Sequence, residues 1–255
     1  MVLFIIMKEI EILSNSNNLI KEATKLKQKK YVLESGKFLV EGKKIIIEIL
    51  KTDYVADYFF VEKGTDYNFL KGEKVYIVTK NIIEKLSDVV SPQGIIGVFN
   101  QKVQKPTYEN GKFLILDRIQ NPENMGAILR TARATDFKNI YLINSVSVLN
   151  SKTIRASMGN QFALNIYNIS ANDVKTLFKN AKIYLADLIG TDVFSCNKFE
   201  KNVGLVIGNE GNGISDELID FVKDKLTLPM LNNVESLNAS VSASILMYQI
   251  MEKSK

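Results

Sequence analysis

Polar residues able to hold a ligand gather near the C-terminus, after a short apolar run that ends in Leu228-Pro229-Met230. Proline removes a backbone donor and the polar residues 231–235 cannot continue a strand, so the chain is expected to turn there. Ser236 is then the expected N-cap of a helix. Short side chains at 239–244 would let a ligand or another backbone approach closely. The segment is typical of a cofactor-binding loop, and an ordinary buried C-terminal helix is the alternative.

A second candidate follows the apolar strand that ends at Leu116. Asn121 and Pro122 predict a helix start, with Glu123 placed favourably in its first turn. Arg130 comes one turn after Gly126, whose missing side chain leaves space beside the arginine stem. The missing side chain leaves room for a ligand beside Gly126, with a surface arginine above a helix glycine as the alternative. Glycine inside a helix costs about 1 kcal/mol relative to alanine, which favours a specific reason for it.

A glycine-rich loop, 208–215, follows the apolar strand that ends at Ile207. Loops at the carboxyl ends of strands are where α/β sheets bind ligands. The spacing matches neither the G-x-x-x-x-G-K-S/T phosphate loop nor G-x-G-x-x-G, and Glu210 would repel a phosphate. A ligand loop and a plain tight turn both fit this segment when it is taken alone.

The composition excludes several kinds of chemistry. The chain has no histidine and one cysteine, Cys196, so an internal disulfide and a multi-cysteine zinc site are excluded. Nucleophilic catalysis of the Ser-His-Asp or Cys-His kind is excluded too, and we expect no metal. Any catalysis must use a device other than histidine as general base.

The charge distribution points to an anionic partner. Net charge is +5, and residues 21–44 contain eight lysines against three glutamates. All four arginines, Arg118, Arg130, Arg133 and Arg155, fall in one short span of a chain with 33 basic residues, which suggests that these positions need a bidentate guanidinium. A solvated helix face is the alternative for the lysine run. The basic side chains that could contact such a partner include Lys29, Lys30, Lys43, Arg133 and Arg155.

The elements that must position these residues form two α/β domains. We expect a first domain at 1–100, with a lysine-bearing helix over 14–30, then a polar linker at 101–110 and a second domain at 111–255. Continuous apolar runs at 113–116, 140–143, 183–186 and 203–207 alternate with helical segments and predict a parallel sheet covered on both faces. The apolar run 1–7 is too short for a membrane span and lacks a signal peptide's features, so we expect a cytoplasmic protein.

Taken together, three segments in this order resemble the SpoU branch of the SPOUT superfamily, the S-adenosylmethionine-dependent RNA 2′-O-ribose methyltransferases. The motifs are Asn124-Met125-Gly126 through Arg130, then Ile207-Gly208-Asn209-Glu210-Gly211, then Leu228-Pro229-Met230 with Glu235-Ser236-Leu237-Asn238. The resemblance covers residues 111–255. It extends more loosely to 31–99, where it includes Ser91-Pro92-Gln93-Gly94.

The resemblance implies an α/β fold in which the C-terminal segment of a parallel sheet is tied in a deep trefoil knot, a rare arrangement. It also implies that residues 1–100 form a smaller α/β domain of a ribosomal-protein type that binds the RNA substrate, and that residues 111–255 form the catalytic domain. The candidates for binding RNA are then Lys29, Lys30, Lys43, Arg133 and Arg155. Members of the family are homodimers, so Arg155 is expected to act beside the partner's site. Ribosomal RNA is the expected substrate, most of all 23S ribosomal RNA. Transfer RNA is the alternative, followed by a non-catalytic RNA-binding protein.

The resemblance also implies roles for single residues. Arg130 matches the family arginine that contacts the 2′-hydroxyl and an adjacent phosphate, with the acceptor of the proton left open. The other catalytic positions are Asn124, Glu210, Ser236 and Asn238. Contacts to the cofactor S-adenosylmethionine are expected at Ala186, Asp187, Leu188, Ile207, Gly208, Asn209, Gly211, Leu228, Met230, Leu237, Asn238 and Ala239.

Overall fold

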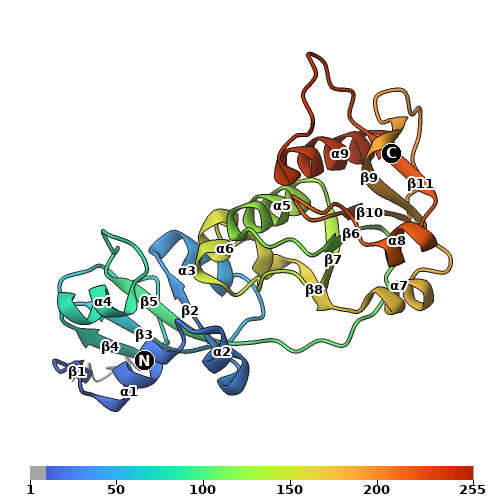
Figure 1. Cartoon of the computed structure of the whole chain (residues 1–255). Helices are drawn as coiled ribbons and strands as arrows, with labels where there is room; N and C mark the ends of the chain where they lie inside the picture. The colour runs from blue at the N-terminus through green and yellow to red at the C-terminus, as the bar shows by residue number, and fades with distance from the viewer. Residues whose placement is uncertain (1–9, 255) are drawn as a thin grey trace, which may run out of the picture. The chain divides into compact units, whose positions relative to one another are not determined.

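The computed structural model describes residues 10–254 of the 255-residue chain, so the apolar run 1–7 lies outside the described residues. The chain divides after Val103 into two compact units, coloured blue to green and green to red in Figure 1. Within residues 10–254, no helix has both the length and the hydropathy needed to cross a membrane.

The first unit is built on a five-stranded mixed sheet in the order β1-β4-β3-β5-β2. Strand β5 (Ile95–Asn100) is antiparallel to its neighbours, β3 (Ala56–Glu62) and β2 (Lys37–Glu41), whereas β4 (Val75–Val78) is parallel to β3 and to β1 (Ile10–Ile12). The helices are α1 (Asn18–Lys25), α2 (Lys29–Ser35), α3 (Lys43–Leu50) and α4 (Lys80–Leu86). Apolar residues of α1 and α4 pack with Phe60 and Tyr76 in one core cluster, while α3 buries Ile46 and Ile49.

The single helix expected over 14–30 is wrong. Asn17 caps α1 by accepting a hydrogen bond from the Leu19 backbone N–H at 2.9 Å, so the helix begins later than expected. It ends at Lys25 in a tightened turn, where the N–H groups of Leu26 and Gln28 donate to carbonyls three residues earlier. The chain therefore forms two short helices in place of one.

The second unit is a six-stranded, wholly parallel sheet in the order β11-β9-β10-β6-β7-β8. Its strands are β6 (Lys112–Asp117), β7 (Phe137–Ile143), β8 (Asn165–Asn168), β9 (Lys182–Asp192), β10 (Val203–Ile207) and β11 (Asp224–Thr227). Successive residues of a strand face opposite sides: Leu114 and Leu116 join one core cluster, Phe113 and Ile115 the other. Both faces are buried, as the continuous apolar runs predict.

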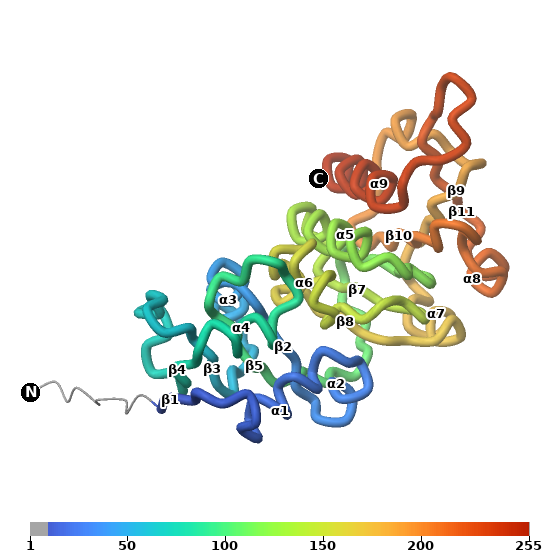
Figure 2. The backbone as a smooth tube through the Cα atoms, turned by 60° about the vertical axis from the view of Figure 1, so that its left-hand side comes forward, coloured from blue at the N-terminus to red at the C-terminus, as the bar shows by residue number. Residues whose placement is uncertain are grey.

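Helices cover the two faces of this sheet unequally. Helices α5 (Pro122–Ala134) and α9 (Ala239–Lys253) pack together over one face, with α6 (Ser151–Ser157) and the short 3-10 helix η1 (Asn160–Ala163) against α5. Helices α7 (Ala171–Leu177) and α8 (Asp216–Phe221) cover the other face, as Figures 1 and 2 show from two directions. After the edge strand β11 the chain crosses back over β9 and β10 to reach α5, the course that the expected knot requires.

Gly126 serves helix packing, which corrects the expectation of a ligand beside it. A Cβ atom at this position would lie 2.8 Å from the backbone nitrogen of Ser157 and 2.9 Å from the carbonyl oxygen of Thr153. Both atoms belong to α6, and Gly126 itself is buried. The missing side chain therefore lets α5 and α6 approach closely, and no space remains there for a ligand.

We expect Gly126→Ala to lower the free energy of unfolding by about 2 kcal/mol, because backbone atoms of α6 cannot move aside as a side chain could. This loss should exceed the gain of about 1 kcal/mol that alanine brings to a helix interior. Urea unfolding measures the change. Gly211→Ala is the control, since its Cβ would meet only the side-chain oxygen of Asn209 at 3.7 Å. A stabilised Gly126→Ala protein would contradict this account.

Candidate active site

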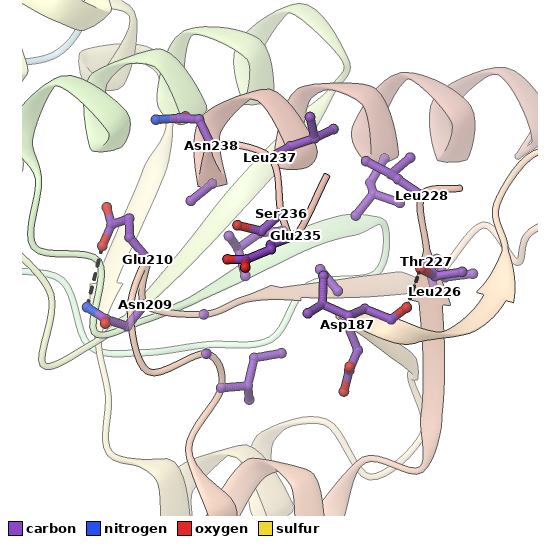
Figure 3. Close-up of a pocket in the computed structure, with 18 of the residues that line it drawn as sticks. Asp187, Asn209, Glu210, Leu226, Thr227, Leu228, Glu235, Ser236, Leu237 and Asn238 are labelled. Carbon is purple, nitrogen blue, oxygen red and sulfur yellow. Dashed lines mark hydrogen bonds between the residues drawn. The ribbon is translucent and has the colours of Figure 1, made fainter. Parts of the chain in front are cut away.

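A cavity of about 530 Å³ opens at the carboxyl ends of the parallel strands β9, β10 and β11. Three segments supply its walls: residues 186–188, the glycine-rich loop 207–214, and the stretch 226–239 that runs from β11 into α9. Figure 3 shows Asn209 and Glu210 on one side, Leu226 to Leu228 on the other, and Glu235 and Ser236 between them. This is the sheet edge where α/β proteins bind ligands.

A register jump in β9 shapes the first wall. Lys225 of β11 pairs with Leu185, but the next residue, Leu226, pairs with Thr191, so residues 186–190 bulge out of the ladder. Two contacts fix the bulge: Lys225 Nζ lies 2.7 Å from the Asp187 carboxylate, and Thr227 Oγ1 donates to the Leu188 carbonyl at 2.9 Å. The bulge thereby holds residues 186–188 on the cavity wall.

The glycine-rich loop closes tightly on itself. Backbone N–H groups of Asn209 and Gly213 each donate to the other's carbonyl, at 2.9 and 3.0 Å. A Cβ at Gly208 would lie 2.6 Å from the Gly213 carbonyl oxygen, so only glycine fits at the start of the loop. The ends of the loop are therefore joined, and Figure 3 shows the Glu210 side chain beside that of Asn209.

Asn238, and not Ser236, caps the last helix. The Asn238 side-chain oxygen accepts from the backbone N–H of Ser240 at 2.8 Å and of Val241 at 3.4 Å. The N-cap predicted at Ser236 is wrong because asparagine caps as well as serine does, and residues 235–237 stay outside the helix. Ser236 is exposed and lines the cavity, so its hydroxyl is available to a ligand.

A chain of hydrogen bonds links the three sequence motifs. The Asn238 side-chain amide donates to Asn124 Oδ1 at 3.0 Å, and Asn124 Nδ2 donates to Glu210 Oε1 at 2.9 Å. Asn124 is 8% exposed, so its amide is committed to these two partners. Residues separated by more than eighty positions in sequence are thus fixed in one relative orientation.

All twelve positions at which the sequence predicts cofactor contacts lie on the wall of the cavity, and so do Glu210 and Ser236. Their function as cofactor contacts stays a prediction. Six further lining residues had not been assigned a role: Gly213, Ile214, Leu226, Thr227, Glu235 and Leu246. Glu235 belongs to a quoted motif and Gly213 to the glycine-rich loop, so those two carried a signal, whereas Leu226, Thr227 and Leu246 look like ordinary strand and helix residues.

Arg130 is not brought to the cavity wall. It lies on α5, two turns beyond Asn124, is exposed, and makes no hydrogen bond or ion pair with any described residue. Its guanidinium is therefore free to meet a ligand that approaches from solvent.

The predicted RNA-binding residues have different surroundings. Lys29 is exposed, Lys30 lies 3.9 Å from Glu34, and Lys43 lies 3.0 Å from Asp66. In the second unit, Arg133 Nη1 donates to Asn160 Oδ1 at 3.2 Å, and Arg155 has a buried Nη1 without a hydrogen-bond partner among the described residues. Their contact with RNA stays a prediction.

In the folded protein, part of the positive charge of the lysine-rich stretch 21–44 is neutralised by aspartates. Aspartates from elsewhere in the first unit form ion pairs with three of its lysines: Asp88 with Lys27, Asp57 with Lys37, and Asp66 with Lys43. The excess of positive charge counted along the sequence therefore overstates the charge that an anionic partner would meet.

The cavity itself is acidic. Asp187, Glu210 and Glu235 line it, and none of the described lining residues is basic. Burial alone would raise the pKa of Asp187, but the Lys225 ammonium and the backbone N–H groups of Leu188 and Ile189 together hold that pKa below its ordinary value. Within residues 10–254 no cluster of histidine, cysteine, aspartate and glutamate could hold a metal ion. The site fits a cationic organic ligand better than a phosphate.

We expect Asp187→Asn to lower the free energy of unfolding at pH 7 by about 0.5–1 kcal/mol, because the ion pair that fixes the bulge is lost. Because the pKa of Asp187 is lower in the folded protein than its ordinary 3.8, the ionised carboxylate stabilises the folded state at pH values above 3.8. This stabilisation is lost as the pH falls through the folded-state pKa. The difference from wild type should therefore be constant near neutrality and vanish below that ordinary value. Unfolding curves from pH 7 down to 3 test it, and a constant difference throughout would contradict it.

Two family descriptions match the chain. The SpoU rRNA Methylase family matches residues 111–248, and an MRM3-like substrate binding domain matches residues 17–97. Among curated proteins, 23S rRNA (guanosine(2553)-2′-O)-methyltransferase RlmP of Bacillus subtilis is 27% identical over 96% of this chain and 99% of its own. Human mitochondrial rRNA methyltransferase 3 is 26% identical over 89% of this chain and 70% of its own.

Two solved structures of methyltransferases have a similar fold over almost the whole length of this chain. An rRNA methyltransferase from Sinorhizobium meliloti, solved with AdoMet bound, has a TM-score of 0.84 at 25% identity and covers 94% of this chain and 96% of its own. A TrmH-family RNA methyltransferase structure from Porphyromonas gingivalis has a TM-score of 0.83 at 28% identity, covering 94% and 99%. The α/β fold with a parallel catalytic sheet and a smaller N-terminal domain is confirmed.

Proposed function

The chain belongs to the SpoU rRNA methylase family and is an RNA 2′-O-ribose methyltransferase that uses S-adenosylmethionine; we propose that its substrate is 23S ribosomal RNA. The acidic cavity at the ends of β9, β10 and β11, joined to Asn124 by hydrogen bonds, is the observation that supports methyl transfer from this cofactor. The choice of 23S ribosomal RNA rests on the relatives. Both units match relatives named for ribosomal RNA, and RlmP matches along nearly its full length.

The cavity residues fit the cofactor. S-adenosylmethionine carries a sulfonium and an ammonium. Three carboxylates lie on the wall and, within the described residues, only that of Asp187 is paired with a lysine, Lys225, so the wall favours such a ligand. Leu226, Leu228 and Leu246 supply an apolar surface that suits a purine ring. When bound, the cofactor supplies a methyl group that is already activated for transfer, so the protein must mainly align the acceptor and handle its proton.

Arg130 is proposed to contact the ribose 2′-oxygen and an adjacent phosphate. With a helical rise of 1.5 Å per residue, Arg130 lies about 9 Å along α5 from Asn124, and helical side chains lean back toward the N-terminus. A guanidinium stays protonated, so it would stabilise the negative charge that develops on the oxygen and would not act as a base. Asn124, Glu210, Ser236 and Asn238 would position the ribose.

One experiment tests this function. The protein is incubated with methyl-labelled S-adenosylmethionine and in vitro transcribed 23S ribosomal RNA, 16S ribosomal RNA or transfer RNA, each free of modifications. Label is expected in 23S ribosomal RNA, at a site that then resists alkaline cleavage because its 2′-hydroxyl is blocked. A transcript with a 2′-deoxy nucleotide at that site is the control and should take no label. Label in transfer RNA alone would overturn the proposed substrate, and no transfer to any RNA would overturn the activity.

The same enzyme is proposed to act as a homodimer through its second unit. Val241 and Tyr248 lie two turns apart on one face of α9 and are each about half exposed, at 46% and 49%, and Leu231 in the preceding loop is 78% exposed. An apolar helix face of this kind is costly in water and fits a second copy of the chain. Sedimentation should give twice the monomer mass, and Tyr248→Glu should shift it toward the monomer.

A further inference from the structure

Two residues outside the quoted motifs hold the glycine-rich loop in place. Asp117 ends β6 and is completely buried, and Arg118 follows it in a left-handed conformation with a φ of 57°. Residues other than glycine rarely adopt that conformation, because it costs free energy that contacts elsewhere in the structure must offset. The position therefore calls for an explanation, and the contacts of Arg118 provide one.

Asp117 and Arg118 bind both ends of the loop. Asp117 Oδ2 accepts from the Ser215 backbone N–H at 2.7 Å, and Arg118 Nη2 donates to the Gly213 carbonyl at 3.4 Å. The left-handed turn directs the Arg118 carbonyl to Asn209, whose Nδ2 donates to it at 2.8 Å. An ion pair of 3.5 Å between Arg118 Nε and Asp117 Oδ1 joins the two holding residues to each other.

The hydrogen bond between Arg118 and Asn209 also affects the position of the next residue, Glu210. The Asn209 side-chain oxygen accepts from the backbone N–H groups of Gly211 and Asn212, at 3.0 and 2.9 Å. It therefore fixes the two residues that follow Glu210 in the chain. Asn209 Nδ2 also lies 3.4 Å from Glu210 Oε2. The orientation of Asn209 thus determines where the Glu210 carboxylate can meet Asn124 and the cavity.

We propose that Arg118, supported by Asp117, is a positioning residue that sets the conformation of loop 208–215 and through it the place of Glu210 and of the cofactor-binding wall. The proposal rests on the proposed function of the cavity as the S-adenosylmethionine site. Arg118 does not itself line the cavity. Its side chain acts through Gly213 and its backbone carbonyl acts through Asn209, two residues that do line it.

Arg118→Gly isolates the side chain, because glycine adopts the observed φ without strain and keeps the carbonyl that binds Asn209. Asp136→Gly is the matched control. Asp136 also has a left-handed φ, of 63°, and makes ion pairs, but it precedes β7 at the opposite end of the parallel strands. Arg118→Lys keeps a positive charge with a single donor group and is the conservative variant.

Calorimetry with S-adenosylmethionine should show Kd about tenfold higher in Arg118→Gly, an intermediate value in Arg118→Lys, and a wild-type value in Asp136→Gly. Arg118→Gly should also have a lower Tm than Asp136→Gly, because it leaves the buried Asp117 carboxylate without its ion-pair partner, so Kd is compared at a temperature at which both variants are folded. Methylation rates in a double-mutant cycle with Glu210→Gln should be non-additive, because the arginine acts through the loop that carries Glu210. A wild-type Kd in Arg118→Gly, or additive effects in the cycle, would overturn the proposal. Failure of the wild-type protein to bind S-adenosylmethionine would overturn the proposed function instead.

Discussion

Arg130→Ala should lose more than about a hundredfold in turnover of RNA while binding S-adenosylmethionine with unchanged affinity and unfolding at the wild-type temperature. The structural reason is that Arg130 is exposed and makes no hydrogen bond or ion pair with a described residue, so its removal breaks nothing in the folded protein. In the proposed role, the charge of Arg130 acts only when RNA is bound. A hundredfold loss corresponds to about 2.7 kcal/mol of transition-state stabilisation.

The measurements are single-turnover methylation of 23S ribosomal RNA, calorimetry with the cofactor and thermal unfolding, all on one preparation. Lys138→Ala is the control, because Lys138 is also an exposed cation but lies near the amino end of β7, away from the cavity, where it pairs with Asp136. Arg130→Lys should recover only part of the rate, since an ammonium cannot form the bidentate contact of a guanidinium. Wild-type turnover in Arg130→Ala would refute the assigned role.

The central architecture of the second unit could be predicted because its interior strands are buried on both faces. Runs such as 113–116 and 203–207 are apolar without interruption, and only a covered parallel sheet explains that pattern. Strands β8 and β11 escaped prediction because they lie at the edges of the sheet. There, Asn165–Asn168 and Asp224–Thr227 mix polar and apolar residues as a loop would.

The site could be predicted in its composition but not in its geometry. Short motifs identify the three loops, because a loop's residue types reflect the turn it must make. Contacts between loops depend on tertiary structure: no local signal shows that Asn124 lies between Asn238 and Glu210, or that Arg118 holds Asn209. Gly126 is the instructive error. A glycine that makes space is recognisable in a sequence, but what occupies the space, here α6, is not.

The largest effect on the site itself should come from Asn124→Asp. This change replaces the amide that donates to Glu210 Oε1 at 2.9 Å with a carboxylate oxygen, and the residue is 8% exposed. The new carboxylate would be nearly buried and would face the exposed Glu210 carboxylate, so the two repel each other. We expect the free energy of unfolding at pH 7 to fall by about 2 kcal/mol and methylation to be lost. Chemical unfolding and methylation assays measure both.

The stability of Asn124→Asp should depend on pH in a way that distinguishes charge repulsion from the loss of a hydrogen bond. Repulsion raises the folded-state pKa of the carboxylate pair, so protonation stabilises the folded variant below the ordinary carboxyl range, and that stabilisation is lost as pH rises through the folded pKa. Asn124→Asp should therefore approach wild-type stability as the buffer is acidified toward pH 4, whereas Asn124→Leu, which removes the polar group without adding charge, should not.

Glu210→Gln in the Asn124→Asp background reverses the direction of the hydrogen bond, because the glutamine amide can donate to the new carboxylate. Stability should return in the double variant. If the rate returns as well, the Glu210 carboxylate serves only to hold residue 124, and if the rate stays low, its charge also acts on the bound ligands. An Asn124→Asp protein as stable as wild type at pH 7, with no gain from the second change, would show that the link between the first and second motifs does not form.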